Sequence, residues 1–197
     1  MKTVAIDIHQ YFEPIEGQRP WRVRLGVGSF LTFDFGRRIK EDHHFRGEWH
    51  LWVYQATWSL LHGERKLADS DSKWQTIEVA IRRLEHQGLS GVKFNPRTSV
   101  TEFLFGGFSL VVSPADYLAD PDERDEYWLL FMPQNVVLTV GPGGVNVGPS
   151  NQSTTTGKPQ DHKPDSLLVR PKKRAVHIRR EDRMSDVVEE INGDSDR

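Results

Sequence analysis

The sequence predicts an α+β protein, with a mostly antiparallel, curved sheet or partial barrel of about seven or eight strands and one amphipathic helix at about residues 72–87. Short runs of aromatic and β-branched residues, separated by turn residues, predict the strands. One apolar stripe at helical spacing predicts the helix. Strands and helices do not alternate regularly, so a doubly wound parallel sheet is not expected.

Strand signals dominate the first third of the chain. Residues 21–25 alternate apolar with basic side chains, as a strand with one solvated face should. Gly26-Val27-Gly28 then interrupts the pattern by a bulge or a tight turn. Residues 29–35 form the next run, which ends at Gly36. Residues 48–60 are the longest run, and apolar groups on both of its faces predict a central strand.

The predicted helix has a start signal, a stripe and a stop signal. Ser72 followed by Gln75 fits a capping box. The apolar stripe consists of Trp74, Ile77, Ile81 and Leu84. Gly88 is predicted to end the helix in the left-handed conformation. We expect the stripe to pack on the sheet and to supply most of the helix's stability.

Two hairpins are predicted after the helix. Residues 100–105 and 108–112 flank Gly106-Gly107, and two glycines between strand runs are typical of a tight hairpin turn. Residues 127–132 and 135–140 form the second pair.

A change of composition near residue 141 divides the chain into three predicted parts. Residues 1–148 carry the strand and helix signals and form the folded α+β body. Residues 149–166 have almost nothing to bury, so they are expected to form a flexible linker. Residues 167–197 form a tail that we expect to bind a partner or to dock on the body.

Composition excludes several classes of function. The chain has no cysteine, so disulfides, thiol catalysis and Cys-type zinc sites are excluded. A net charge of -2 provides no global field for nucleic acid or acidic membranes. Asp7 interrupts any signal-peptide core, and no stretch reaches the roughly 20 apolar residues that span a bilayer. We therefore expect a cytoplasmic protein without a membrane partner, and we expect no cofactor.

A histidine-rich segment offers a metal site as the alternative. His43, His44 and His50 lie near Glu41 and Asp42, and these side-chain types suit a divalent metal ion. Such a site would make the chain a metal-dependent hydrolase. The spacing matches no metallohydrolase motif, however, so the favoured interpretation is a surface loop without a metal.

The tail carries the predicted partner-binding residues. They are Leu167, Leu168, Val169, Arg170, Lys172, Lys173, Arg174, Val176, Ile178, Arg179, Arg180, Val187, Val188 and Ile191. Aliphatic residues interleaved with basic ones are typical of a segment that folds on contact with a protein. The basic run also leaves association with nucleic acid open, although acidic residues between 181 and 190 offset it.

Four segments carry a resemblance to a group of proteins. They are residues 28–36, 48–54, 101–105 and 127–130. In these segments the chain resembles small uncharacterised bacterial proteins, some of them similar to immunity proteins of toxin systems, over residues 22–140. The resemblance implies a bacterial, cytosolic accessory role and carries over no catalytic residue. Together with the tail, it leads us to expect a non-enzymatic protein that binds a protein partner, of an immunity, antitoxin or defence type.

Overall fold

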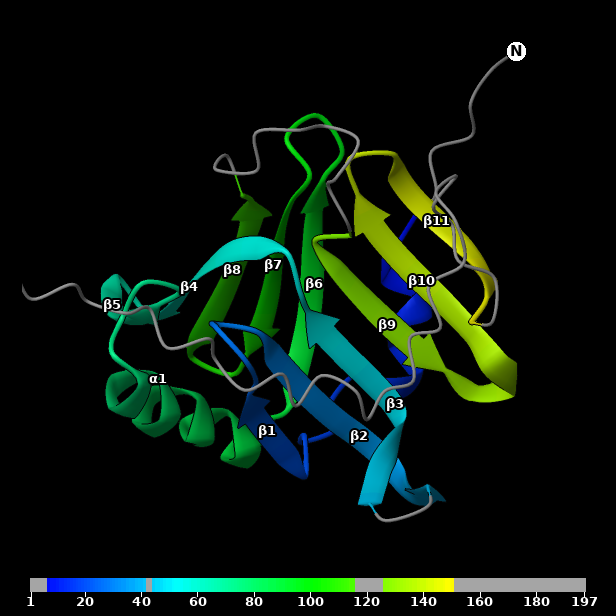
Figure 1. Ribbon diagram of the computed structural model, residues 1–197, viewed down its shortest axis with the longest axis horizontal. Coiled ribbons are helices and arrows are strands. Elements are labelled where there is room, and N and C mark those ends of the chain that lie inside the picture. Colours follow the sequence, from blue (N-terminus) through cyan, green and yellow to red (C-terminus); the bar gives the residue numbers. More distant parts are fainter. Residues whose placement is uncertain (1–6, 42–43, 116–125, 151–197) are drawn as a thin grey trace, which may run out of the picture. The chain divides into compact units, whose positions relative to one another are not determined.

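The chain folds into two antiparallel sheets that pack face to face, with one α-helix beside them (Figure 1). This computed structural model describes residues 7–41, 44–115 and 126–150. All of these lie in the unit Met1–Lys163, and the second unit, Pro164–Arg197, lies outside the described residues. None of the described helices is long and apolar enough to cross a membrane.

The structure describes sixteen helical and strand elements along the chain. In order, they are the 3-10 helices η1 (His9–Tyr11) and η2 (Glu13–Ile15), the strands β1 (Arg22–Leu25), β2 (Leu31–Glu41), β3 (His44–Val53), β4 (Ala56–His62) and β5 (Arg65–Asp69), the helix α1 (Trp74–Ile81) with the 3-10 helix η3 (Arg82–His86), the strands β6 (Leu89–Asn95), β7 (Val100–Phe105), β8 (Phe108–Pro114) and β9 (Trp128–Met132), the 3-10 helix η5 (Pro133–Asn135), and the strands β10 (Val136–Gly141) and β11 (Gly144–Pro149).

Each sheet is a simple antiparallel array. The first has the strand order β1-β2-β3-β9-β10-β11, and the second has the order β5-β4-β8-β7-β6. The prediction of a mostly antiparallel sheet with one α-helix is confirmed for the described residues. The predicted number of strands is wrong, because the described residues form eleven strands in two sheets, and these do not close into a barrel.

The predicted strand at residues 48–60 is in fact two strands in different sheets. β3 lies inside the six-stranded sheet and β4 inside the five-stranded sheet, with Tyr54 and Gln55 between them. The backbone N–H of Tyr54 donates to the Tyr127 carbonyl at 2.9 Å, which closes the end of the β3–β9 ladder. Both strands bury one face in the same core, so the apolar pattern continues across the junction and conceals it.

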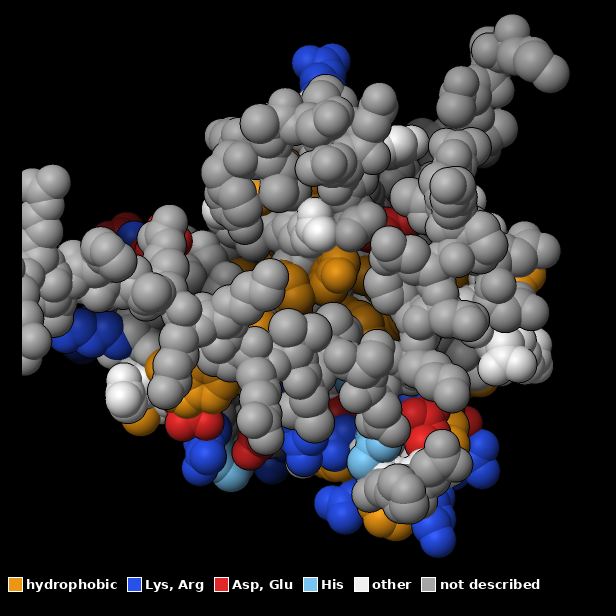
Figure 2. Space-filling view, viewed as in Figure 1, with side chains coloured by type: hydrophobic (Ala, Val, Ile, Leu, Met, Phe, Trp, Pro, Cys, Tyr) orange, Lys and Arg blue, Asp and Glu red, His pale blue; other side chains and the backbone are white. Residues whose placement is uncertain are grey.

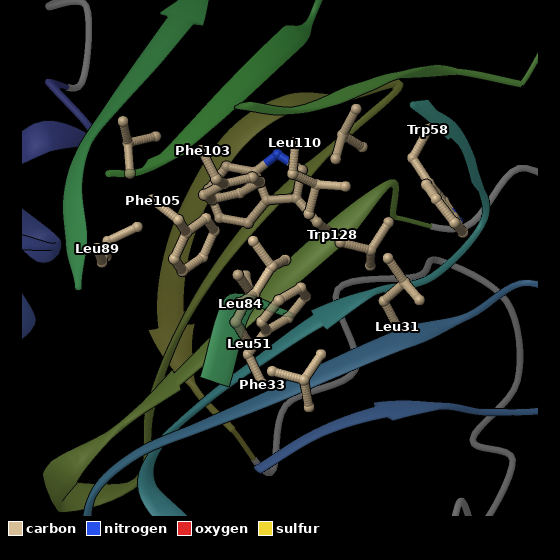
Figure 3. Close-up of a cluster of buried hydrophobic side chains, with 14 of the residues drawn as sticks. Leu31, Phe33, Leu51, Trp58, Leu84, Leu89, Phe103, Phe105, Leu110 and Trp128 are labelled. Atoms are coloured by element: carbon tan, nitrogen blue, oxygen red, sulfur yellow. The ribbon is translucent and has the colours of Figure 1, made fainter. Parts of the chain in front are cut away.

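The core lies between the sheets and is rich in aromatic side chains (Figure 3). Phe103 and Trp128 meet edge to face, with ring centroids 5.4 Å apart. The Trp128 indole N–H donates to Thr101 Oγ1 at 2.8 Å, so both buried polar groups are satisfied. Leu84 of η3 reaches this core and is also fully buried.

The helix differs from its prediction at both ends. α1 begins at Trp74 with Lys73 as the N-cap residue, and no side chain caps it. Ser72 instead accepts a hydrogen bond from the Asp69 backbone N–H at 3.0 Å. Trp74 is 47% exposed, while Ile77 and the later stripe residues are buried. The predicted apolar stripe is therefore buried only from Ile77 onward.

Gly88 is needed for a close approach rather than for a left-handed conformation. Its φ is not positive, and a Cβ at this position would lie 2.7 Å from the Gly17 carbonyl oxygen. The neighbouring Leu89 exchanges backbone hydrogen bonds with Gly17 and Gln18 at 2.7 and 2.9 Å. The chain before β1 thus lies directly against the start of β6.

Two turn predictions and one strand-pairing prediction are confirmed. Gly26 N donates to the Phe30 carbonyl at 2.7 Å in the turn between β1 and β2. Gly106, with φ of +57°, makes the tight turn of the β7–β8 hairpin, and β9 pairs with β10 as expected. The run that was predicted to end at Gly36 continues to Glu41, because Gly36 (φ +69°) lies in a β-bulge and does not end the strand.

Candidate functional site

A buried carboxylate lies on the outer face of the six-stranded sheet. Asp34 of β2 is fully buried and accepts three hydrogen bonds at 2.6 Å, from Arg22 Nε, the Gly47 backbone N–H and His50 Nδ1. Burial alone would raise the pKa of Asp34. The hydrogen bond from His50 and its positive charge when protonated, the Gly47 amide and Arg22 outweigh burial, so the pKa lies below the ordinary aspartate value.

His50 connects this carboxylate to an aromatic cluster. Its Nε2 accepts a hydrogen bond from the Trp52 indole N–H, while its Nδ1–H points at Asp34. The rings of Trp52 and Phe131 meet edge to face at 5.3 Å. An Asp–His pair is a familiar general base, but that role needs a free outer nitrogen. Here the indole occupies it, so the arrangement joins β2, β3 and β9 instead of presenting a base.

The predicted histidine cluster does not converge among the described residues. His44 lies opposite Glu41 at the end of the β2–β3 hairpin, with its Nε2 3.2 Å from Glu41 Oε2. His50 lies six residues further along β3, which is roughly 20 Å of extended strand. No group of three or more potential metal ligands is found in the described part of the chain. His43 lies outside the described residues.

The tail residues predicted to bind a partner, from Leu167 to Ile191, also lie outside the described residues. The same holds for most of the predicted linker, since β11 ends at Pro149. Those assignments therefore stay predictions.

The β2–β3 hairpin extends beyond the sandwich and carries many charges (Figure 1). We call its end, residues 38–41 and 44–47, the hairpin tip. Figure 2 shows Lys, Arg, carboxylate and apolar side chains gathered around this tip. Between residues 19 and 48 the sequence has seven Lys or Arg and four Asp or Glu, although the whole chain is slightly acidic. The tip is therefore a basic region of an acidic protein.

The charges on the outer face of the hairpin are paired. Glu41 accepts from Arg46 Nε and lies against His44. Arg37 Nη2 donates to Glu48 Oε1 at 2.7 Å, and this hydrogen bond lowers the pKa of Glu48 and raises that of Arg37. These groups satisfy one another.

The inner face of the tip is different, because its cations have no carboxylate. Alternation from the register pairs Arg38↔Gly47 and Lys40↔Phe45 places Arg38, Lys40 and Phe45 on this face. The Arg38 guanidinium carbon lies 4.6 Å from the ring centroid of Trp21. Among the described residues neither Arg38 nor Lys40 forms an ion pair. We call Trp21, Arg38, Lys40 and Phe45 the basic–aromatic face.

Phe45 is the exposed apolar residue of this face. Its side chain is 48% exposed. Arg22, held by Asp34, donates through Nη2 to the Phe45 carbonyl oxygen. The buried carboxylate thus fixes the backbone that carries this exposed ring.

Sequence reasoning missed both the buried carboxylate and the basic–aromatic face. It interpreted the segment around His43 and His44 as a metal site or a surface loop, and it began the next strand only at residue 48. The alternating residues Arg38-Ile39-Lys40 and Phe45-Arg46 on either side of a short polar turn could have indicated a hairpin. No local signal pairs Asp34 with His50, because that contact depends on the register across the bulge at Gly36.

Comparison of the chain with protein-family models, with curated proteins and with solved structures found no match in any of the three.

Proposed function

We propose that this chain is a non-enzymatic, cytoplasmic protein-binding module of the bacterial immunity, antitoxin or defence-accessory type, and that the basic–aromatic face is a contact surface for its protein partner. The observation that carries the proposal is the exposed Phe45 ring beside Arg38 and Lys40, whose charges have no carboxylate among the described residues.

Phe45 supplies the apolar contact. An aromatic ring that is half exposed in the free protein gains free energy when a partner covers it, and aromatic and Arg side chains dominate the binding energy of protein interfaces. Lys40 lies directly opposite Phe45 in the hairpin register. Cations beside an apolar contact speed the approach of an acidic partner and select against a basic one.

The fold supports this contact by holding it in place. Arg22 connects the Phe45 carbonyl to Asp34, and Asp34 also holds Gly47 on the same strand. A preorganised loop or hairpin loses less conformational entropy on binding than a mobile one. The arrangement therefore favours recognition by a rigid surface.

The tail belongs to the same proposal as a second contact. Leu168 and Ile178 are two of its predicted anchors, and they lie outside the described residues. In this proposal the body and the tail bind the same partner. Once the body is bound, the linker holds the tail near the partner and so raises the effective concentration of the tail.

The test is affinity capture from cells of the source organism with three full-length baits: wild type, Phe45→Ala and Val79→Ala. Val79 is the matched control, because it is 63% exposed on α1 and also loses an apolar side chain. A partner should be captured by the wild type and by Val79→Ala, and its affinity for purified Phe45→Ala should be weaker by roughly tenfold or more.

The outcome that contradicts the proposal is equal capture by all three baits, since the hairpin would then not contribute to binding. Full-length Leu168→Ser and Ile178→Ser baits test the tail separately. Unchanged capture by both would remove the tail from the interface while leaving the hairpin result intact.

A further inference from the structure

We propose that Trp21 and Arg38 form a binding site for a carboxylate, and that its ligand is an acidic side chain of a protein partner. This inference rests on the proposed function for the identity of the ligand. The site itself follows from three observations at the hairpin tip and at the neighbouring residues Trp21 and Arg22.

The first observation is an unpaired buried donor. The Trp21 indole nitrogen is buried and has no hydrogen-bond partner among the described residues. Three of the other described indoles, those of Trp52, Trp58 and Trp128, donate to His50, the Ser29 carbonyl and Thr101, respectively. Buried N–H groups are normally satisfied, and the Trp21 nitrogen has almost no exposed surface. An outside acceptor would therefore reach it only when a neighbouring side chain, such as the exposed Arg38, moves aside.

The second observation is the pair of cations around this indole. The guanidinium carbons of Arg38 and Arg22 lie 4.6 and 4.8 Å from the Trp21 ring centroid. Arg22 already donates to Asp34 and to the Phe45 carbonyl. Arg38 is exposed and has neither a carboxylate nor a carbonyl partner among the described residues. The planar guanidinium group of Arg38 can therefore donate two parallel hydrogen bonds to one carboxylate.

The third observation is the asymmetry of the hairpin. On the outer face, Glu41 and Glu48 neutralise Arg46 and Arg37. On the inner face, the described residues contain no acidic side chain paired with Arg38 or Lys40. An anion would supply the acceptor that the Trp21 indole N–H and the Arg38 guanidinium lack. The same face of the hairpin carries the exposed Phe45 ring.

The neighbouring ring decides which anion is expected. Phe45 is on the same face as Arg38 and opposite Lys40, so a ligand that covers the site also covers an apolar ring. A protein segment with acidic and aliphatic side chains matches both features. A free phosphate or a nucleic-acid backbone matches only the charge, and either one is an alternative outcome of the test.

The test follows the indole N–H resonances of the 15N-labelled full-length protein, in which Trp21→Phe identifies the Trp21 signal. The probe is a blocked peptide of sequence Glu-Glu-Leu-Glu-Glu, and the control peptide is Gln-Gln-Leu-Gln-Gln. We expect the acidic peptide to shift the Trp21 signal progressively to saturation, and the Gln peptide to leave it unmoved. Arg38→Gln should weaken this binding at least fivefold, whereas Arg97→Gln, at an exposed turn between β6 and β7, should not change it.

Three results would overturn the site. The Trp21 signal could remain still at millimolar acidic peptide, it could move equally in Arg38→Gln, or it could respond as strongly to inorganic phosphate or to an oligothymidine as to the peptide. The peptide titration does not depend on the outcome of the affinity-capture experiment. If the peptide binds as expected but Phe45→Ala still captures the same partner, the carboxylate site stands and the proposed function fails.

Discussion

The Asp34 carboxylate and the Gly47 amide join neighbouring strands at a position that only glycine can occupy. Asp34 Oδ1 accepts from Gly47 N at 2.6 Å, and a Cβ on Gly47 would lie 2.6 Å from the Phe35 nitrogen and 2.5 Å from the Trp49 oxygen. The close approach lets one buried side chain bind β1, β2 and β3 together, which fixes the direction in which the hairpin leaves the sheet.

Replacing Asp34 with Asn should strongly destabilise the protein. The change leaves Arg22 without its charged partner and replaces an acceptor of three hydrogen bonds. Breaking a buried ion pair costs about 3–5 kcal/mol. Urea unfolding of Asp34→Asn and of wild type measures the difference, and Arg37→Gln, which breaks the exposed pair with Glu48, should unfold like wild type. Equal stability of all three proteins would mean that the buried carboxylate does not stabilise the fold.

The same carboxylate should make the stability depend on acid. Because its pKa in the folded protein is lowered, Asp34 contributes stability that is fully present above the pKa of an unfolded aspartate, about 3.9. That contribution is lost as the pH falls through the folded value. Urea midpoints between pH 2 and 6 should therefore fall more steeply in wild type than in Asp34→Asn. Parallel curves would show that another group controls the acid response.

Substitution of Gly47 by Ala should also be severe. The added methyl group would contact backbone atoms of Phe35 and Trp49, which cannot move without breaking the β2–β3 ladder. We expect a loss of at least about 2 kcal/mol. The control is Gly143→Ala, where an added Cβ meets nothing within 4 Å. Thermal unfolding of the two variants should separate them by several degrees, and similar melting temperatures would mean that the β2–β3 contact is looser than described.

Gly88 provides a test between two explanations of one glycine. If it ended the helix in the left-handed conformation, Asn would be tolerated there. The contact of its Cβ position with the Gly17 oxygen at 2.7 Å predicts instead that Gly88→Asn loses about 2 kcal/mol. Gly63→Asn is the comparison, because its φ is +58° and its Cβ position is open. Chemical denaturation of both variants should show the larger loss at Gly88, and the reverse order would restore the helix-stop interpretation.

Local patterns predicted much of the fold, because they depend on a few neighbouring residues. The glycines at 106 and 107 identify the β7–β8 hairpin, and Ile77, Ile81 and Leu84 identify the buried side of the helix. The pattern failed where two elements share one core, as at Tyr54, since the alternation of buried residues does not reveal that the chain changes sheets. It also missed β5, an edge strand of largely polar residues whose composition gives little β signal.

The site was less accessible to sequence reasoning than the fold. His50 stood out by composition, and the sequence grouped it with His43 and His44 because they are close along the chain. An extended strand separates such neighbours, and its partners come from other strands instead: Asp34 from β2 and Phe131 from β9. Trp21 carried no signal at all, since its unpaired nitrogen is a property of packing and not of residue type.

The passage of the chain from β3 into β4 has a mechanical consequence. Only two residues separate an interior strand of one sheet from an interior strand of the other, and both strands bury one face in the same core, so we expect the two layers to unfold together. The backbone amide hydrogens of Leu51 in β3 and Leu60 in β4 should therefore exchange through the same opening event. Native-state hydrogen exchange should give them equal free energies of opening.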